Sequence, residues 1–229
     1  MNIQLLGWEF VADETKLFRF TKPAGLDYRA GQSVDLTLPT GAMHPYSLVS
    51  APHESELAIA TRMRPSAFKK ELGALQEGAE VTIEGPFGSF FLHENVTRPA
   101  VFIAGGIGIT PFYSMVKDAT NRALMHEMHL FYSNHRPEDA AFLTELRALE
   151  NENQRFAFVP TMTKPEASSE PWTGEHGYVT AEMIKKYVRA TNPIYYCAGP
   201  APMVTAMRML LKTIGVSEDD IRFEEFTGY

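Results

Sequence analysis

The sequence predicts two domains: a six-stranded antiparallel β-barrel over residues 1–97, followed by an α/β domain with a Rossmann-like parallel sheet over residues 98–229. Three observations support this prediction. In the first half, short apolar or alternating segments are separated by Gly and Pro turns, as in a small antiparallel barrel. After Arg98-Pro99 such segments alternate with helical patterns, which indicates a parallel sheet covered on both faces. A chain of 229 residues can also form two cores of ordinary domain size.

The first domain is expected to contain one short helix among its strands. Phe68, Leu72 and Leu75 are spaced so that they share one helical face. Turns are predicted at Pro23-Ala24-Gly25 and Ala30-Gly31, where Gly and Pro interrupt the apolar segments. The expected strands cover residues 3–11, 16–21, 33–38, 46–50, 56–61 and 80–84.

The second domain is expected to alternate strands with helices. Thr180 is a good N-cap for one of these helices. The polar segment Lys164–Gly177 is predicted to be an exposed loop. The expected strands cover residues 100–104, 127–132, 155–160, 194–197 and 220–226, and the expected helices cover 110–119, 137–149, 180–189 and 202–213.

The most informative segment is Val101–Pro111, where an apolar strand enters a glycine turn and a helix begins. Thr110 is expected to cap this helix, with Pro111 at its first position. Such a helix N-terminus can bind a phosphate group. The backbone can turn sharply and approach a ligand at Gly105, Gly106 and Gly108.

Composition excludes several classes of function. The net charge of −7 argues against nucleic-acid binding. No apolar run is long enough to span a bilayer, and the N-terminus does not resemble a secretory signal, so we expect a cytoplasmic protein. A single cysteine excludes a cysteine-ligated iron–sulfur cluster within these 229 residues. No metal site is predicted.

Four further motifs occur in order along the chain. They are His44-Pro45-Tyr46-Ser47, Gly85–Phe90, Tyr195–Pro200 and Phe223–Tyr229. Together with the glycine turn, their order and spacing resemble the ferredoxin–NADP reductase superfamily over nearly the whole chain. The resemblance implies a flavin-binding barrel followed by a domain that binds a nicotinamide nucleotide.

In the barrel, the resemblance places Tyr46 against the isoalloxazine and Ser47 near flavin N5. An aromatic plane can stack on the flat ring, and a small hydroxyl leaves N5 open to hydride. Tyr46 could instead be a tyrosine of the barrel core. The residues expected to bind the flavin are His44, Tyr46, Ser47, Leu48, Arg62, Met63, Arg64, Ser66, Ala67 and Phe68.

His44 departs from the family pattern, because an arginine usually grips the flavin pyrophosphate at this position. A neutral histidine offers one donor in place of a bidentate fork, so we expect a weaker grip. Arg62 or Arg64 could supply the missing charge, whereas Lys69 and Lys70 could equally form a solvated basic face. We expect FAD in preference to FMN.

In the second domain, the resemblance assigns the glycine turn to the pyrophosphate of NADPH or NADH. Ser133 and Arg136 could accept the extra phosphate of NADPH, which favours NADPH, or could face water. The cysteine that commonly precedes the second glycine turn is Ala198 here, and Cys197 is expected to point away into the core. The nucleotide contacts are expected at Gly106, Gly108, Ile109, Thr110, Pro111, Ser133, Asn134, Arg136, Gly199 and Pro200.

The terminal strand carries the family's Glu-x-aromatic element. Glu224 is a candidate proton relay near Ser47, and either Phe226 or Tyr229 is expected to cover the second flavin face. The residues expected at the reacting centre are therefore Tyr46, Ser47, Glu224, Phe226 and Tyr229.

The resemblance implies an oxidoreductase that takes hydride from NAD(P)H onto FAD. We expect a monomer that passes electrons to an external carrier, such as ferredoxin, flavodoxin or an oxygenase component. Two alternatives stay open. One is a reductase of free flavin, which the weaker phosphate grip of His44 favours. The other is a non-catalytic nucleotide-binding or redox-sensing module.

Overall fold

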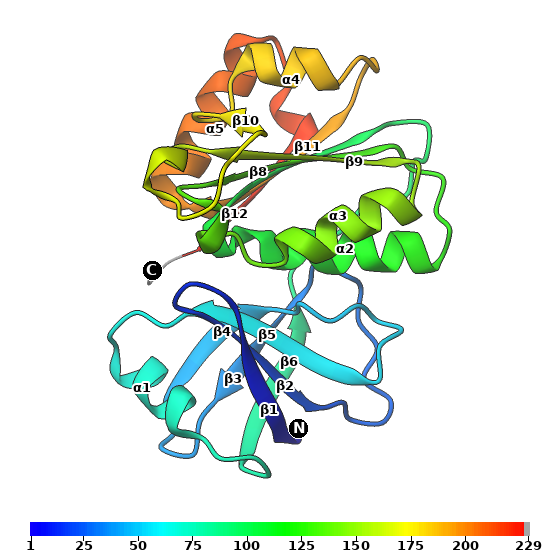
Figure 1. Ribbon diagram of the computed structural model, residues 1–229. Helices are drawn as coiled ribbons and strands as arrows, with labels where there is room; N and C mark the ends of the chain where they lie inside the picture. The colour runs from blue at the N-terminus through cyan, green and yellow to red at the C-terminus, as the bar shows by residue number, and fades with distance from the viewer. Residues whose placement is uncertain (227–229) are drawn as a thin grey trace.

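The first half of the chain forms a six-stranded antiparallel sheet in the computed structural model, which describes residues 1–226 (Figure 1). The strand order is β4-β3-β6-β1-β2-β5. Ser66 caps the short helix α1 (Ala67–Ala74), because its hydroxyl accepts the N–H of Lys69. The strands are β1 (Asn2–Ala12), β2 (Thr15–Thr21), β3 (Ser33–Thr37), β4 (Met43–Ser47), β5 (Glu56–Arg62) and β6 (Glu80–Phe87).

This sheet curls as a barrel does but is not closed. Its edges are β4 and β5, and no strand pairing joins them in the part of the chain that the structure describes. The predicted six-stranded antiparallel domain is confirmed, and the structure adds that its barrel stays open between β4 and β5. One reason is that β4 has only five residues and contains Pro45, which has no N–H to donate to another strand. The strand also begins at Met43 and ends at Ser47, earlier than predicted.

The second half forms a sheet with the order β10-β9-β8-β7-β11-β12, in which every pairing is parallel. Helices α2 and α3 lie between this sheet and the first domain, and α4 and α5 cover the other face (Figure 1). The strands are β7 (Ala100–Gly105), β8 (Met128–Asn134), β9 (Phe156–Met162), β10 (Glu175–His176), β11 (Ile194–Pro200) and β12 (Ile221–Phe226). The α-helices are α2 (Thr110–Asn121), α3 (Leu143–Glu152), α4 (Ala181–Tyr187) and α5 (Ala201–Thr213).

The helices begin less simply than the sequence predicts. A 3₁₀ turn, η1 (Gly106–Ile109), precedes α2, so Thr110 is already helical and does not cap the helix. Its hydroxyl instead donates to the Ile107 carbonyl at 3.2 Å. Thr180 does cap α4 as expected, since its hydroxyl accepts the N–H of Met183.

The helix expected over 137–149 is interrupted. A 3₁₀ turn, η2 (Pro137–Asp139), is followed by a break, and α3 starts only after Phe142, whose φ of 61° is left-handed. The polar segment 164–177 is mainly loop, but it also contains η3 (Pro165–Ala167) and the short strand β10, which the sequence did not predict.

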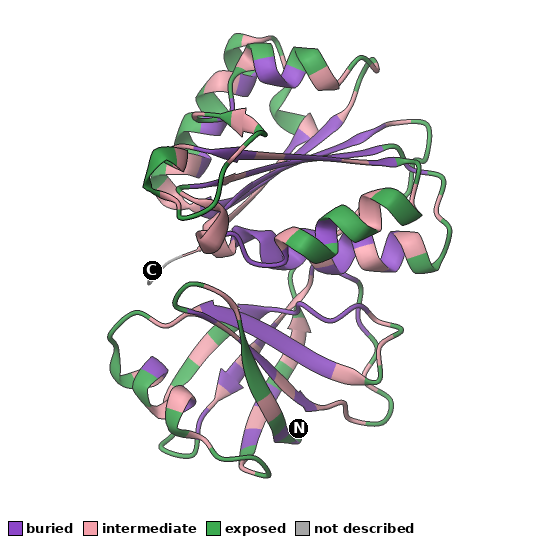
Figure 2. Ribbon diagram, viewed as in Figure 1, coloured by how far each residue is buried: buried purple, intermediate pink, exposed green. Residues whose placement is uncertain are grey.

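The two domains share an apolar contact. Phe112 and Met115 of α2 pack in one buried cluster with Leu17 and Val49 of the first domain. Figure 2 shows this buried layer between the domains and the buried parallel sheet above it. The Ser114 hydroxyl of α2 also donates to the Ser50 carbonyl at 2.7 Å. The domains are thus packed against each other, and their junction positions the site described below.

The chain passes from one domain to the other between the end of β6 and the start of β7. The exact boundary at residue 97 stays a prediction. None of the helices within residues 1–226 has the length and apolar character needed to cross a membrane.

Candidate active site

A cleft lies where the open edge of the first sheet meets the glycine turn of the second domain. It brings together five residues that were predicted as site residues and five that were not. The predicted ones are His44, Tyr46, Ser47, Thr110 and Phe226. The others are Pro45, Ala60, Thr61, Lys69 and Ile107. The two domains therefore contribute to one site.

His44 and Tyr46 form the aromatic wall of this cleft, and Phe68 packs beside them. The His44 ring centroid lies 5.0 Å from that of Tyr46 and 5.6 Å from that of Phe68. Tyr46 is buried, and burial raises the pKa of its hydroxyl to about 12, although the Thr61 side chain acts in the opposite direction. Tyr46 thus offers a neutral aromatic surface, and it also packs into the barrel core, the alternative considered from the sequence.

His44 has little left to offer a phosphate. Its Nδ1 lies 2.8 Å from the Pro45 carbonyl, which can only accept, so Nδ1 carries the proton and donates it there. A neutral His44 then has no N–H for an anion. The expectation of a weak grip at this position follows from the structure as well.

Ser47 and Glu224 meet across the domain junction. The Ser47 hydroxyl donates to Glu224 Oε2 at 3.3 Å, although the two residues are 177 positions apart in the chain. Burial raises the pKa of Glu224 to about 7, and the hydrogen bond from Ser47 opposes this only partly. Glu224 can therefore exchange a proton near neutral pH, as a relay requires.

The glycine turn packs main chain against main chain. A Cβ on Gly108 would collide with the carbonyl of Ala198 and lie 2.7 Å from the Cα of Gly199. Gly106 differs, since it has a φ of +52° and a Cβ there would meet no atom within 4 Å. Gly108 is thus needed for packing, whereas Gly106 is needed for its backbone conformation and faces open space.

The second glycine turn ends β11 and precedes α5. Cys197 is fully buried in the apolar cluster under α4 and α5, whereas Ala198 belongs to the cluster on the α2 side. Burial raises the pKa of the Cys197 thiol well above its usual range. The prediction that Cys197 points away from the site is therefore consistent with its packing.

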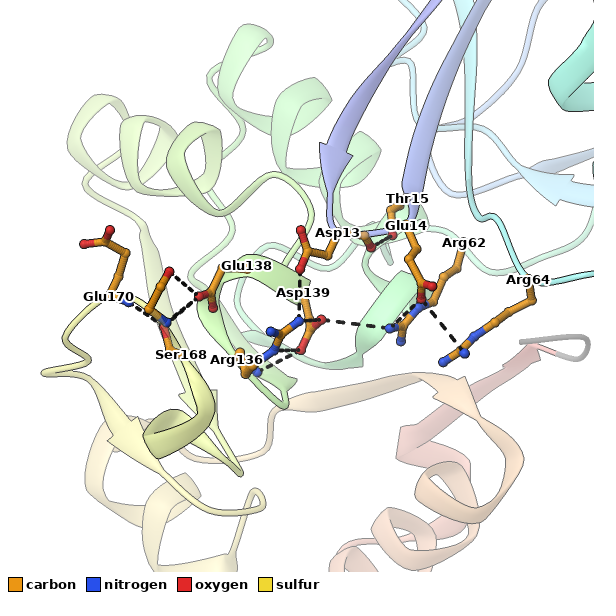
Figure 3. Close-up of polar contacts among 11 residues, drawn as sticks. Asp13, Glu14, Thr15, Arg62, Arg64, Arg136, Glu138, Asp139, Ser168 and Glu170 are labelled. Atoms are coloured by element: carbon orange, nitrogen blue, oxygen red, sulfur yellow. Dashed lines mark hydrogen bonds and ion pairs between the residues drawn. The ribbon is translucent and has the colours of Figure 1, made fainter.

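Several residues expected to bind the flavin are engaged elsewhere. Leu48 lies in the barrel core and its N–H donates to the Gln32 carbonyl. Met63 packs on the same core. Arg62 and Arg64 lie 3.3 and 3.9 Å from the Glu14 carboxylate (Figure 3).

Helix α1 adds basic character to the barrel side of the cleft. Lys69 is buried there, with a pKa lowered by burial and by the charge of Arg64, whereas Lys70 is exposed. The idea of a solvated basic face therefore fits Lys70 and not Lys69. Ser66, Ala67 and Phe68 open the helix as predicted.

On the nucleotide side, Thr110 and Pro111 occupy the first turn of α2, and Ile109 is fully buried beneath them. Ser133 and Asn134 end β8, with Ser133 paired to Gly105 in the register of the sheet. Tyr229 lies outside the described residues. No cluster of three or more His, Cys, Asp or Glu side chains suited to a metal ion occurs within residues 1–226.

The sequence missed several cleft residues for identifiable reasons. Thr61 lies at the end of β5, beside Arg62, and carries no motif of its own. Ile107 lies inside the glycine turn, where an apolar residue between glycines could have signalled contact with a ligand. Lys69 could be separated from Lys70 only by knowing which face of α1 is buried.

The residues of the cleft fit a flavin. Tyr46 and Phe226 supply aromatic surfaces, Ser47 a small hydroxyl, and the Gly106 turn an open main-chain surface at a helix start. An arrangement of this kind, shared between a β-domain and a parallel-sheet domain, is typical of flavin- and nicotinamide-dependent oxidoreductases.

Comparisons with known proteins agree with this class. Residues 102–209 match the model of the oxidoreductase NAD-binding domain family. The chain is 28% identical over 215 residues to the reductase component of propane 2-monooxygenase from Rhodococcus jostii, a match that covers 90% of this chain and 58% of that protein. It spans about three fifths of the length of the first curated relatives it matches.

Solved structures share the whole fold. An Amycolatopsis cytochrome P450 reductase matches with a TM-score of 0.86 and 24% identity over 100% of this chain and 70% of its own. A ferredoxin NADP⁺ reductase from Neisseria gonorrhoeae, solved with bound FAD and NADP, matches with a TM-score of 0.82 and 22% identity over 98% of both chains. The chain therefore has the two-domain fold of a ferredoxin NADP⁺ reductase, the family that its motifs resemble.

Proposed function

We propose that this protein is an NAD(P)H-dependent flavoprotein oxidoreductase that holds FAD in the cleft and passes electrons to an external carrier protein. The observation that supports this most strongly is the hydrogen bond between Ser47 and Glu224 across the domain junction, beside a cleft that Tyr46, Ser47 and Phe226 line. A bound flavin would accept hydride from the nicotinamide and release electrons singly.

The residues of the chain have separate tasks in this proposal. Tyr46 presents a neutral aromatic face and Phe226 helps to exclude water from the cleft. The N-terminal turns of η1 and α2 bind the nucleotide pyrophosphate through main-chain amides. Glu224 holds a proton at neutral pH and exchanges it with the Ser47 hydroxyl, which lies 3.3 Å away.

The electron acceptor is proposed to be a protein of the oxygenase or ferredoxin type. Relatives of this chain include reductase and electron transfer components of a propane monooxygenase and an anthranilate dioxygenase. The single cysteine, Cys197, is buried and cannot ligate an iron–sulfur cluster by itself, so the proposed carrier lies outside these 229 residues. We also propose that the protein acts as a monomer in the cytoplasm.

The test is purification followed by anaerobic reduction. We expect a yellow protein whose FAD remains bound through gel filtration at the elution volume of a monomer. Its flavin absorbance should bleach when NADH or NADPH is added without oxygen. A protein that binds FAD but shows no bleaching with either nucleotide would contradict the proposal.

A second candidate is a reductase of free flavin, which the arrangement around His44 favours. His44 donates to Pro45, and Arg62 and Arg64 face Glu14, so the described side chains leave the flavin phosphates a weak grip. In that case the purified protein would be colourless and would oxidise NAD(P)H only after free flavin is added.

A further inference from the structure

An ion-pair network lies at the carboxyl edge of the parallel sheet, where its strands end, just after β8. Arg136 donates from Nε to Asp139 Oδ2 at 3.1 Å and from Nη2 to Asp139 Oδ1 at 2.9 Å, which makes a bidentate pair. The same Nη2 also donates to Asp13 Oδ2 of the first domain at 3.0 Å. Figure 3 shows Arg136 between these two carboxylates. Nε and Nη2 of Arg136 are therefore directed at aspartates.

The first domain holds Asp13 in this position. Asp13 lies in the tight turn between β1 and β2, and its N–H donates to the Glu138 carbonyl of η2 at 2.8 Å. Glu14, the next residue, faces Arg62 and Arg64, and Arg62 also lies 3.9 Å from Asp139. The turn is thus attached to η2 by main chain and side chains together.

A further carboxylate stands beside this network. Glu138 accepts from the hydroxyls of Ser168 and Ser169 at 2.9 and 3.0 Å and from the Ser169 N–H at 2.9 Å. Hydrogen bonds from main-chain N–H groups are the main cause that lowers the pKa of Glu138 to about 2, and the two serine hydroxyls add to this effect. Glu138 is therefore an anion at neutral pH. Four carboxylates and three guanidinium groups share this edge: Asp13, Glu14, Glu138, Asp139, Arg62, Arg64 and Arg136.

The position of the network matters for nucleotide choice. In dinucleotide-binding sheets of this kind, an acid near the end of a neighbouring strand recognises the ribose 2′-hydroxyl, whereas an arginine there accommodates the 2′-phosphate. β8 is paired with β7, the strand that leads into the glycine turn. A phosphate that used Arg136 would have to displace two aspartates and remain beside them, which like charge opposes.

We propose that this edge selects NADH over NADPH, with Asp13 and Asp139 as the residues that keep Arg136 from a 2′-phosphate. The inference rests on the proposed function and names the substrate of the same site. It reverses the preference for NADPH that Ser133 and Arg136 suggest in the sequence. Asp13 has a specificity role although it belongs to the other domain.

The test compares NAD⁺ and NADP⁺ binding to the FAD-loaded protein by isothermal titration calorimetry. We expect NAD⁺ to bind at least about tenfold more tightly than NADP⁺. Asp13→Asn should shift the ratio toward NADP⁺ by roughly threefold, as expected for one exposed ion pair. The steady-state kcat/KM ratio for NADH and NADPH should move in the same direction.

Glu218→Gln is the matched control for charge. Glu218 pairs with Arg208 and lies in η4, which directly precedes β12, so its loss removes one negative charge away from this network. The ratio should not change. Equal or tighter binding of NADP⁺ by the wild type, or an unchanged ratio in Asp13→Asn, would overturn the inference while leaving the proposed oxidoreductase intact. Binding of neither nucleotide would overturn both.

Discussion

On the α/β side of the cleft, the groups proposed to bind a phosphate are main-chain amides of the glycine turn that opens η1. On the barrel side they are side chains, and three of these are engaged: Arg62 and Arg64 face Glu14, and His44 donates to Pro45. A neighbouring carboxylate can neutralise a cation, but a turn built on Gly106 and Gly108 keeps its geometry whatever surrounds it. The proposed nucleotide wall is therefore built into the backbone, and the proposed flavin wall depends on side-chain partners.

The largest expected effect separates two glycines of the same turn. Gly108→Ala places a Cβ against the Ala198 carbonyl, so we expect a loss of about 3 kcal/mol in the free energy of unfolding. Gly106→Ala meets no atom and should cost only about 1 kcal/mol, from its left-handed backbone. Urea unfolding of both variants measures the difference. Equal costs would mean that the turn is not packed on β11 as described.

The next effect concerns Glu224, whose carboxylate accepts a hydrogen bond from Ser47 across the domain junction. Because the pKa of Glu224 is raised to about 7 by burial, the folded protein binds this proton more tightly than the unfolded chain does. Its contribution is full below pH 4.5 and is lost as pH rises toward 7, a change of roughly 2–3 kcal/mol. Glu224→Gln should remove that slope from the unfolding free energy.

Glu225→Gln provides the control for this slope. Glu225 is the exposed neighbour of Glu224 on the same strand. Its substitution should leave the pH dependence between 4.5 and 7 unchanged. If both variants keep the wild-type slope, Glu224 does not bind the proton as proposed.

A smaller effect tests the aromatic wall. Tyr46→Leu keeps an apolar side chain but removes the ring, so FAD affinity should fall by about tenfold, which corresponds to about 1.4 kcal/mol. Fluorescence titration of the protein with FAD measures this change. Tyr113→Leu removes a ring that stacks on Phe142 instead and is not among the cleft residues, so FAD affinity should be unaffected. Equal FAD affinity in Tyr46→Leu and the wild type would reject Tyr46 as a flavin contact.

The smallest effect compares two helix caps. Ser66→Ala and Thr180→Ala each remove a hydroxyl that accepts a main-chain N–H at 3.1 Å, and each should cost about 1 kcal/mol of stability. Only Ser66 caps a helix beside the cleft, because Lys69 of that helix lines it. Thermal unfolding should shift similarly in both variants, whereas weaker FAD binding is expected in Ser66→Ala alone. Weaker binding in both would point to a global effect.

Features that depend on the backbone could be predicted from the sequence. The order of strands and helices follows from hydrophobic periodicity. The glycine turn follows from glycines, which tolerate the positive φ and the close main-chain contacts that other residues do not. The predicted N-cap of α2 was wrong by one residue, although the predicted range does begin at Thr110. A 3₁₀ turn precedes the helix, and the Thr110 hydroxyl donates to the Ile107 carbonyl within it.

Features that join distant segments could not be predicted in the same way. Nothing in the local sequence shows that Asp13 reaches Arg136, 123 positions later, or that Glu14 faces Arg62. Ser47 and Glu224 were brought together only by the family resemblance. The open edge between β4 and β5 likewise depends on the register of strands that are far apart in the chain.

The most direct test of the shared cleft is hydrogen–deuterium exchange with each ligand in turn. FAD should protect the main chain around 44–47 and 60–69, and NAD⁺ added to the FAD-loaded protein should protect 105–110. Both ligands together should slow exchange at the end of β12 near Glu224. Protection by either ligand only at segments outside this cleft, such as the loop that carries Trp172, would contradict a common site between the domains.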